Sequence, residues 1–437
     1  MLFPEALQYL LSLGHETLAM KLGLENIEKL LNALGQPISG VPKVQIAGTN
    51  GKGSAAVMLD AIMRAAGYRT GLYTSPHLIS VTERMRIDGE EIPQEYFASC
   101  STEVRRVSEN LLEAGAIKAL PTFFEQTTAI ALLAFAGARI ELAILETGLG
   151  GRLDATTATL AETVAITPVS FDHQEYLGNT MREIAAEKAA IIRPGVTAIV
   201  GTQPQEAMEV ILKRCEECNV APRFAAFKAE VTGSDAEGRL RVSFETGLAN
   251  YENVLLGLRG RHQIENASIA IALAESLIDK GFRISRENII AGLERARHAG
   301  RLDLRIIGGH KVLFDGAHNA AGAESLRAYM DEFVDAPITL IFGAMRDKDL
   351  TGIAATLFPI AQRIILTEPP NPRAATNETL LNAVPPGVDR SRIILTESFD
   401  EAFRIAQEKT PSDGLICITG SLYLVGEGMV EGMRDEG

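Results

Sequence analysis

Short apolar runs alternate with helical patterns through the first part of the chain. Residues 44–47, 142–145 and 164–167 form three such runs, and a helical pattern begins at Ser54. Strands that are buried on both faces are short and apolar, and crossover helices connect them when they are parallel. The pattern therefore predicts a mainly parallel α/β sheet.

Two other segments follow different patterns. Residues 239–244 alternate between polar and apolar side chains, which predicts antiparallel strands, and a helix follows over about residues 264–278. Near the N-terminus, apolar residues recur at helical spacing and predict an amphipathic helix. These residues are Leu24, Ile27, Leu30, Leu31 and Leu34.

The alternation of strands and helices resumes beyond residue 300. The strand-like runs there are residues 311–314, 338–342, 363–366, 392–395 and 415–419. A chain of 437 residues exceeds the size at which one hydrophobic core keeps growing. We therefore predict a domain of residues 1–298 and a smaller α/β domain of residues 299–437, with a hinge near residues 298–301.

Composition and charge narrow the classes of partner. Hydrophobic residues make up 46% and charged residues 22% of the chain, close to globular averages. The net charge of −14 repels nucleic acid and anionic membranes. Residues 1–14 carry no basic leader, and the apolar stretch 127–138 is far shorter than the roughly 20 residues that span a bilayer. We expect a cytoplasmic monomer without nucleic-acid or membrane partners.

The four cysteines carry little functional signal. Cys215 and Cys218 form a CxxC pattern in a charged, helix-like run, without a second pair or a histidine partner. Zinc needs about four ligands. We therefore expect ordinary surface thiols in a reducing compartment.

The strongest local signal for chemistry is the glycine-rich segment 48–54, GTNGKGS, which follows a predicted strand and opens a helix. Such a loop presents backbone N–H groups to phosphate, and the helix N-terminus adds partial positive charge. Lys52 would reach the outer phosphates, and Ser54 would contact Mg²⁺. Gly53 separates these two residues, unlike the usual GxxxxGK[ST] spelling, so a structural glycine-rich turn is the alternative to phosphate binding.

Acidic and imidazole side chains follow two more predicted strands. Glu146 comes directly after the second apolar run, and Asp172 and His173 follow the third. Ligands collect at the carboxyl ends of strands, so Glu146 is a candidate Mg²⁺ ligand and His173 a candidate for a second metal. A solvated strand end and a structural histidine are the alternatives. Taken alone, Lys188, on a predicted helix over residues 182–192, is typical of a surface lysine.

Together these segments resemble the folylpolyglutamate synthase family, which belongs to the Mur ligase superfamily. The matching segments, in order, are GTNGKGS, YTSPH (73–77), ETGLGGRLDATT (146–157), DH (172–173), EKAAII (187–192), HQIENA (262–267), GR (300–301), DGAHN (315–319) and TGSLY (419–423). The match covers roughly residues 20–425. It implies an α/β fold in which a P-loop, mainly parallel-sheet ATPase domain precedes a smaller Rossmann-like domain.

The resemblance also implies roles for individual residues. The residues expected to bind ATP are Asn50, Gly51, Lys52, Gly53, Ser54, Asn266, Arg301 and Asp315. The ligands expected for two Mg²⁺ ions are Ser54, Ser75, Glu146, His173 and Lys188, the last as a carbamylated lysine. The residues expected in catalysis are Lys52, Glu146, His173, Lys188 and His318. The hinge reads Ala-Gly-Arg where the family commonly has Pro-Gly-Arg, which leaves the guanidinium in place.

The resemblance extends to the substrate side. The residues expected there are Thr122, Phe123, Phe124, Glu125, Arg152, Leu153, Asp154 and Ser421. The segment TFFE resembles a pterin-side segment of bacterial bifunctional enzymes, and an aromatic pair there could stack on a flat ring. On its own, such a pair is more often part of a core.

The implied reaction is ATP-dependent ligation of L-glutamate to dihydropteroate, to (tetrahydro)folyl-glutamates, or to both, through an acyl phosphate in folate biosynthesis. ATP would be a substrate and Mg²⁺ the cofactor. The spellings GTNGKGS and TFFE favour the bifunctional form over folylpolyglutamate synthase activity alone. Two alternatives stay open. One is a Mur-type ligase of a uridine-linked substrate, which Gly53 and the TSPH segment disfavour. The other is a nucleotide-binding module without ligase activity.

Overall fold

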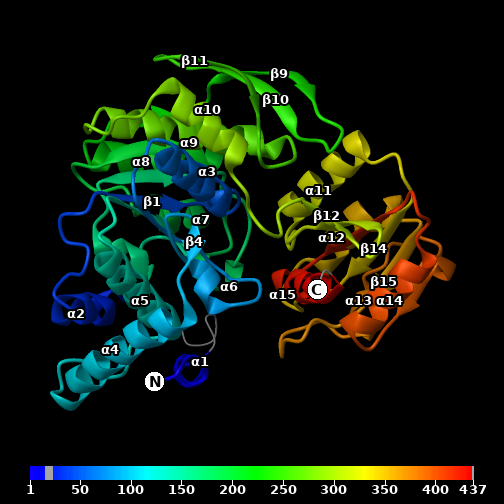
Figure 1. The fold of residues 1–437 in the computed structure, drawn as a ribbon, viewed down its shortest axis with the longest axis horizontal. Helices are drawn as coiled ribbons and strands as arrows, with labels where there is room; N and C mark the ends of the chain where they lie inside the picture. The colour runs from blue at the N-terminus through cyan, green and yellow to red at the C-terminus, as the bar shows by residue number, and fades with distance from the viewer. Residues whose placement is uncertain (15–22, 436–437) are drawn as a thin grey trace.

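The computed structural model describes residues 1–14 and 23–435. Three β-sheets organise these residues, two before residue 300 and one after it (Figure 1). No helix within the described ranges is long and apolar enough to cross a membrane.

The first sheet has eight strands in the order β4-β3-β2-β5-β1-β6-β7-β8, and the run from β2 to β8 is parallel. Its strands are β1 (Lys43–Ala47), β2 (Thr70–Tyr73), β3 (Met85–Ile87), β4 (Glu90–Glu91), β5 (Leu142–Glu146), β6 (Thr163–Ile166), β7 (Thr197–Val200) and β8 (Arg223–Phe224). Every residue of β1 and β5 is buried. The prediction of a mainly parallel sheet with strands at the three apolar runs is confirmed.

Helices cover both faces of this sheet. The helices and 3-10 turns of this part are α1 (Phe3–Ser12), α2 (Glu25–Ala33), α3 (Lys52–Ala65), η1 (Val81–Arg84), α4 (Gln94–Glu113), α5 (Phe123–Ala138), η2 (Ala155–Thr159), α6 (Gln174–Leu177), α7 (Met181–Ala189), α8 (Gln205–Glu217), α9 (His262–Ile278) and α10 (Arg286–Arg295). Leu142 and Ile144 of β5 pack with α3, α9 and α10. Ala143 and Leu145 pack on the opposite face with α1, α2, α4 and α5. The predicted amphipathic helix is α2, which buries Ile27 and two leucines.

The cysteines of the CxxC pattern are not surface thiols, so that expectation is wrong. Cys215 and Cys218 are 2% and 5% exposed. The buried face of α8 carries Ala207, Ile211 and Cys215 at helical spacing, and this face packs in the core that also contains α7. The charged residues of the run lie on the other side of the helix, which is why the composition alone suggested exposure.

A three-stranded antiparallel sheet follows α8, in the order β11-β10-β9. Its strands are β9 (Lys228–Ser234), β10 (Leu240–Glu245) and β11 (Asn250–Leu255). In β10, Leu240, Val242 and Phe244 are buried and the residues between them are not. The predicted antiparallel strands are confirmed, as is the helix that follows, α9.

The sheet after residue 300 has six strands in the order β12-β13-β17-β14-β15-β16. The elements of this part are β12 (Asp303–Ile307), β13 (His310–Phe314), α11 (Ala320–Phe333), β14 (Ile338–Phe342), α12 (Leu350–Leu357), η3 (Phe358–Ile360), β15 (Arg363–Leu366), α13 (Asn377–Asn382), η4 (Arg390–Arg392), β16 (Ile393–Leu395), α14 (Phe399–Lys409), β17 (Leu415–Thr419) and α15 (Leu422–Asp435). All five predicted runs overlap strands. The pattern did not predict β12, because most of its residues are only half-buried and form no apolar run.

The segment around the predicted hinge contains neither helix nor strand. It connects α10 to β12, so the first two sheets lie before it and the six-stranded sheet lies after it. The α/β fold is confirmed, whereas the exact domain boundary at residues 298–299 stays a prediction.

Candidate functional site

Three loops meet at the carboxyl edge of the first sheet. Strand β1 lies between β5 and β6, with Ile46 paired to Glu146 and Ala47 paired to Ile166. The loops that leave these three strands therefore lie side by side. The order of the strands thus places the loop after β1 between two loops that lie about 100 and about 120 residues further along the sequence.

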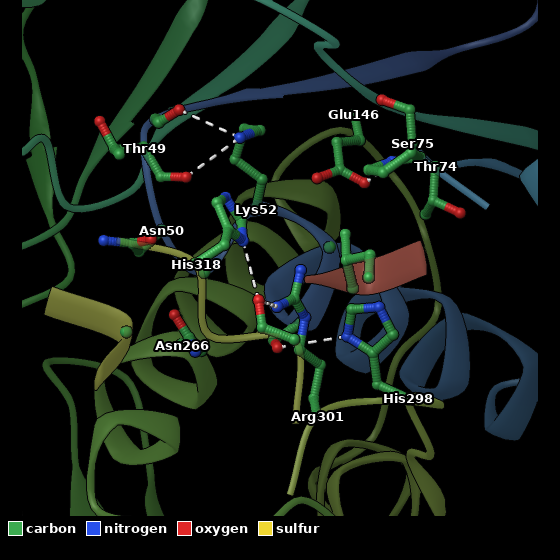
Figure 2. A pocket seen from close by; sticks show the side chains of 18 of the residues that line it. Thr49, Asn50, Lys52, Thr74, Ser75, Glu146, Asn266, His298, Arg301 and His318 are labelled. Carbon is green, nitrogen blue, oxygen red and sulfur yellow. Dashed lines mark hydrogen bonds between the residues drawn. The ribbon is translucent and has the colours of Figure 1, made fainter. Parts of the chain in front are cut away.

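The glycine-rich loop passes directly into α3, whose first residue is Lys52. The Lys52 ammonium donates hydrogen bonds to the backbone oxygens of Gly48 at 3.2 Å and Thr49 at 3.1 Å, so the loop curls around its own lysine (Figure 2). Gly51 has a φ of 86°, and a Cβ there would collide with the Asn266 amide from α9. Glycine at this position therefore admits Asn266, a predicted nucleotide contact, to the loop.

Glu146, the last residue of β5, is 5% exposed. Its carboxylate accepts a hydrogen bond from the Ser75 backbone N–H at 3.1 Å (Figure 2). Burial raises the pKa of Glu146, and the nearby charges of Lys52 and Arg301 oppose that rise. A buried carboxylate with one backbone hydrogen bond has acceptor capacity left for a cation.

Lys188 projects from α7 and contacts the glycine-rich loop of residues 48–54, which we term the phosphate loop after its predicted ligand. It is 4% exposed, and its Nζ donates a hydrogen bond to the Gly48 carbonyl oxygen at 2.8 Å. The interpretation of Lys188 as a surface lysine is therefore wrong. Burial, together with the charge of Lys52, lowers the pKa of Lys188 to about 7. A large share of the amine is neutral near neutral pH, which makes it nucleophilic.

Asp172 lies beyond β6 and meets side chains from both parts of the chain. Its carboxylate is 2.9 Å from the Lys348 ammonium, 3.7 Å from Nε2 of His173 and 3.9 Å from Nε2 of His318. Burial alone would raise the pKa of Asp172, but these three neighbours lower it well below its ordinary value. Burial lowers the pKa of both histidines to about 4, so both rings are neutral at neutral pH.

Arg301 and His318 share one acceptor in the part after residue 300. Arg301 Nη1 at 3.3 Å and His318 Nδ1 at 2.8 Å both donate to the Gly316 carbonyl oxygen (Figure 2). Asp315, which precedes this glycine, is buried and accepts two backbone hydrogen bonds at 2.9 and 3.0 Å. Burial raises the pKa of Asp315. Arg301, in the predicted hinge, therefore helps to fix the turn that carries His318.

These side chains line one cavity of about 340 Å³ between the two parts of the chain. Across it, Asn319 Nδ2 donates a hydrogen bond to Asn50 Oδ1 at 3.2 Å. The predicted residues that line the cavity are Asn50, Gly51, Lys52, Gly53, Ser54, Ser75, Glu146, His173, Lys188, Asn266, Arg301, Asp315 and His318. The structure thus brings every predicted ATP, metal and catalytic residue to one place.

A second cavity of about 180 Å³ adjoins the first, and both are lined by Ser75, His173 and His318. Its other lining residues include Phe124, Met345, Lys348, Arg373, Ser421 and Tyr423. Asp347 also lines it, 3.9 Å from Arg373. With two cations against one carboxylate, and with aromatic rings, the pocket suits an anionic substrate with an aromatic part.

The comparisons with known proteins bear on both parts. The models of the Mur ligase middle domain and of the Mur ligase glutamate ligase domain match residues 46–274 and 300–422. Dihydrofolate synthase/folylpolyglutamate synthase of Bacillus subtilis is 33% identical over 422 residues, which cover 95% of this chain and 96% of that protein. The chain belongs to the folylpolyglutamate synthase family of Mur ligases.

Other members extend the likeness. A "Probable bifunctional folylpolyglutamate synthase/dihydropteroate synthase" of Haloferax volcanii is 35% identical over 97% of this chain, which spans only 50% of that protein. Mycobacterium tuberculosis folylpolyglutamate synthase complexed with ADP superposes with a TM-score of 0.91 at 30% identity, covering 99% of this chain and 98% of that one. Escherichia coli FolC in complex with DHPP and ADP gives 0.86 at 30% identity, covering 99% of both chains.

In this folylpolyglutamate synthase family member, the TFFE segment divides between two roles. Thr122 and Glu125 cap α5, since Thr122 Oγ1 accepts from the Glu125 N–H and the Glu125 carboxylate accepts from the Thr122 N–H at 2.7 Å. Phe123 is 5% exposed and belongs to the core. Phe124 lines the second cavity, with its ring against Gly148. Only Phe124 of this segment faces either cavity.

The other predicted substrate-side segment, residues 152–154, lines neither of the two cavities. Arg152 is largely exposed and pairs with Glu187 at 2.9 Å, and Leu153 is half-buried. Asp154 is buried and accepts from the backbone N–H groups of Gly148 at 2.8 Å and Leu149 at 3.0 Å. Asp154 therefore fixes the loop that follows Glu146, and a substrate contact from this segment stays a prediction.

Sequence reasoning missed Lys348 and Arg373, two cations of the second cavity. Neither residue belongs to one of the recognised motifs of the family. Both lie on loops that follow the carboxyl ends of strands, β14 and β15. The rule that singled out Glu146, that ligands collect at strand ends, would have found them.

Proposed function

We propose that this chain joins L-glutamate to dihydropteroate, to folyl-glutamates, or to both, at the expense of ATP. The strongest support is the pair of joined cavities, one around the phosphate loop and one with two cations and an aromatic ring. Relatives named dihydrofolate synthase/folylpolyglutamate synthase support the same substrates. Two activities in one chain would follow from an acceptor cavity that takes both pteroate and folyl-glutamate.

The first proposed step activates the acceptor carboxylate. Amide formation from a free carboxylate is uphill in water, so a carboxylate oxygen attacks the γ-phosphorus of ATP and gives an acyl phosphate and ADP. Lys52 and the N-terminus of α3 supply positive charge to the phosphate oxygens. Holding the carboxylate and the γ-phosphate in register lowers the barrier by roughly 7–11 kcal/mol.

The second step forms the amide. The glutamate α-amine attacks the acyl carbonyl carbon, the bond from that carbon to the phosphate oxygen breaks, and phosphate leaves. His318 faces both cavities, and because its Nδ1 donates to Gly316, its Nε2 keeps a lone pair that can take the amine proton. Lys348 and Arg373 would offer positive charge to the two glutamate carboxylates, and Ser421 lines the same cavity.

The donor set fits magnesium. Mg²⁺ prefers oxygen ligands and is commonly held by one or two carboxylates together with substrate phosphates. Ser54, Ser75 and Glu146 would hold one ion, and His173 with carbamylated Lys188 would hold a second. Within the described ranges, no group of three histidine, cysteine or acidic side chains is arranged to hold a metal by itself. Bound magnesium would neutralise charge on the phosphate oxygens.

The environment of Lys188 supports carbamylation. The reaction with CO₂ needs a neutral amine, and burial lowers the pKa of Lys188 to about 7. The carbamate nitrogen keeps one hydrogen, so the hydrogen bond to the Gly48 carbonyl oxygen can persist. The modification would place two oxygen donors beside the phosphate loop in a position where the unmodified side chain offers none.

A phosphate-release assay tests the proposed function. We expect ATP turnover that requires both glutamate and an acceptor, measured with dihydropteroate and with tetrahydrofolate. Turnover with tetrahydrofolate alone would restrict the chain to folylpolyglutamate synthase activity. Turnover with a uridine-linked acceptor, or ATP hydrolysis that ignores both glutamate and the pterin acceptors, would contradict the proposal.

A further inference from the structure

The residue that departs from the usual phosphate-loop spelling contacts the hinge. Gly53 lies in the first turn of α3, where its helical backbone does not itself demand glycine. A Cβ at Gly53 would lie 2.7 Å from Cε1 of His298 and 3.3 Å from its Nε2. The His298 ring, which Figure 2 shows in the cavity, therefore packs against Gly53 in the space that a side chain at position 53 would occupy. We term this position of the ring its seat on Gly53.

The next residue, Ser54, is held by two side chains. Its Oγ is 3.3 Å from Nδ1 of His298 and 3.4 Å from Nε2 of Gln263. Asn266 Nδ2 donates to Gln263 Oε1 at 2.9 Å, which fixes the orientation of the Gln263 amide. The Gln263 nitrogen is thus the donor to Ser54, and the Ser54 hydroxyl cannot donate in return.

The hydrogen bonds of Ser54 follow when the neutral His298 ring carries its proton on Nε2 rather than on Nδ1. A serine hydroxyl has one hydrogen and two acceptor lone pairs. Gln263 occupies one lone pair, and the hydrogen points to Nδ1 of His298, the remaining partner in contact. A neutral imidazole with its proton on Nε2 accepts at Nδ1. The second lone pair of Ser54 stays free to face the cavity.

We propose that His298 is a positioning residue: by accepting the Ser54 hydroxyl hydrogen from its seat on Gly53, it aims the free lone pair of Ser54 at the metal–nucleotide complex. This inference rests on the proposed function, in which Ser54 is a Mg²⁺ ligand. His298 and Arg301 belong to the same hinge segment, so the position of the hinge determines both the Arg301 contact and the seat of the ring.

The test measures binding of AMPPNP to the full-length chain by isothermal titration calorimetry, with and without Mg²⁺. His298→Ala removes the acceptor and should weaken the Mg²⁺-dependent affinity about 10-fold, the value of one hydrogen bond, with the Mg²⁺-free affinity unchanged. His298→Asn, whose amide oxygen can take the place of Nδ1, should stay within about 2-fold of the parent chain. Equal losses with and without Mg²⁺, or an Asn variant as weak as the Ala variant, would overturn the inference.

A double-variant cycle tests the seat itself. A Cβ at Gly53 would meet the His298 ring at 2.7 Å and Glu146 Oε2 only at 3.3 Å. Gly53→Ala should therefore displace mainly the ring and cause a similar loss of Mg²⁺-dependent affinity, and adding it to His298→Ala should cause little further loss, because both substitutions remove the same interaction. Additive losses would refute the seat on Gly53. Thermal denaturation of each variant establishes that it is folded. If the parent chain bound no AMPPNP in the presence of Mg²⁺, the proposed function would fail as well. If the parent chain bound AMPPNP and the variants bound it equally well, only this inference would fail.

Discussion

Two of the regions at which the two parts of the chain touch have opposite character. At the first, which we term the cavity contact, the Asp172–Lys348 ion pair and the Asn50–Asn319 hydrogen bond join polar groups beside the phosphate loop. The ion pair is nearly buried, since the two side chains are 11% and 12% exposed. Every interaction that defines this contact depends on orientation and charge.

At the second region, the hairpin contact, the turn between β9 and β10 packs on α11. A Cβ at Gly238 would lie 2.9 Å from atoms of both Tyr329 and Phe333. Phe333 packs against the core of the first part as well as that of the second. The Tyr329 hydroxyl donates to the Glu237 carbonyl oxygen at 3.0 Å. This contact therefore buries apolar surface, which stabilises without strict orientation.

The difference indicates a division of labour. A buried ion pair contributes little net stability, because desolvation of the two charges offsets their attraction, but it fixes geometry. Packed aromatic rings contribute stability, and their contacts constrain the relative orientation of the two parts less strictly than an ion pair does. We expect changes at the cavity contact to impair catalysis, with a loss of stability only where a buried charge is left unpaired, and changes at the hairpin contact to alter stability alone.

The largest expected effect comes from the phosphate loop beside the cavity contact. Lys52→Ala removes the charge that we propose for the ATP phosphates and should lower ATP turnover by about 10²–10³-fold or more. Thermal denaturation should be nearly unchanged, because the hydrogen bonds of Lys52 are confined to its own loop. Lys29→Ala, a lysine on α2 remote from the cavity lining, is the matched control. Near-normal ligation by Lys52→Ala would remove this residue from the mechanism.

Lys348→Met breaks the ion pair itself. Asp172 is then left without its closest cation, and its pKa rises towards the ordinary value. Ligation should fall by about 10–100-fold, and stability by about 2 kcal/mol, because an unpaired buried charge is costly. The double variant Asp172→Asn/Lys348→Met should regain the stability but not the activity. If both recover together, the ion pair serves the fold rather than the substrate.

Gly238→Ala probes the hairpin contact. Its φ of 76° is unfavourable for alanine, and the added Cβ would press on both rings, so stability should fall by about 1–2 kcal/mol in chemical denaturation. Ligation should stay within about twofold of the parent chain. Gly233→Ala, in β9 of the same sheet, is the matched control because no atom lies within 4 Å of its Cβ. A loss of ligation well beyond twofold would contradict the expectation that the hairpin contact serves stability rather than catalysis.

The parts of the fold that the sequence predicts are those with local signals. Strands β1 and β14 are buried along their whole length, so their apolar runs identify them without knowledge of their partners. The edge strand β12 is half-buried, and its pairing with β13 supplies what its own residues do not indicate. The buried side of α8 was missed because its charged side dominates the composition of that segment.

The same distinction holds for the site. The glycine-rich loop and Glu146 were predictable because each follows a strand directly and has a local spelling. The partnership of Asp172 with Lys348 joins residues 176 positions apart, and no local spacing encodes it. The resemblance to the family compensated where local chemistry gave the wrong answer, at Lys188, whose burial depends on the packing of α7 near the phosphate loop.

The smallest expected effect is a dependence on pH that we predict for Lys188, beside the cavity contact, and not for the hairpin contact. The Lys188 amine loses its proton as the pH rises through about 7, so formation of its carbamate should rise between pH 6 and pH 8. The measurement is ¹³C NMR of the protein in ¹³C-bicarbonate, and Lys188→Arg should give no signal. Burial raises the pKa of Tyr329, so its hydroxyl in the hairpin contact stays protonated between pH 6 and pH 8. The stability lost in Gly238→Ala should therefore not vary with pH over this range. A carbamate signal that is constant with pH, or that survives in Lys188→Arg, would contradict carbamylation of Lys188 and place the modification on another amine.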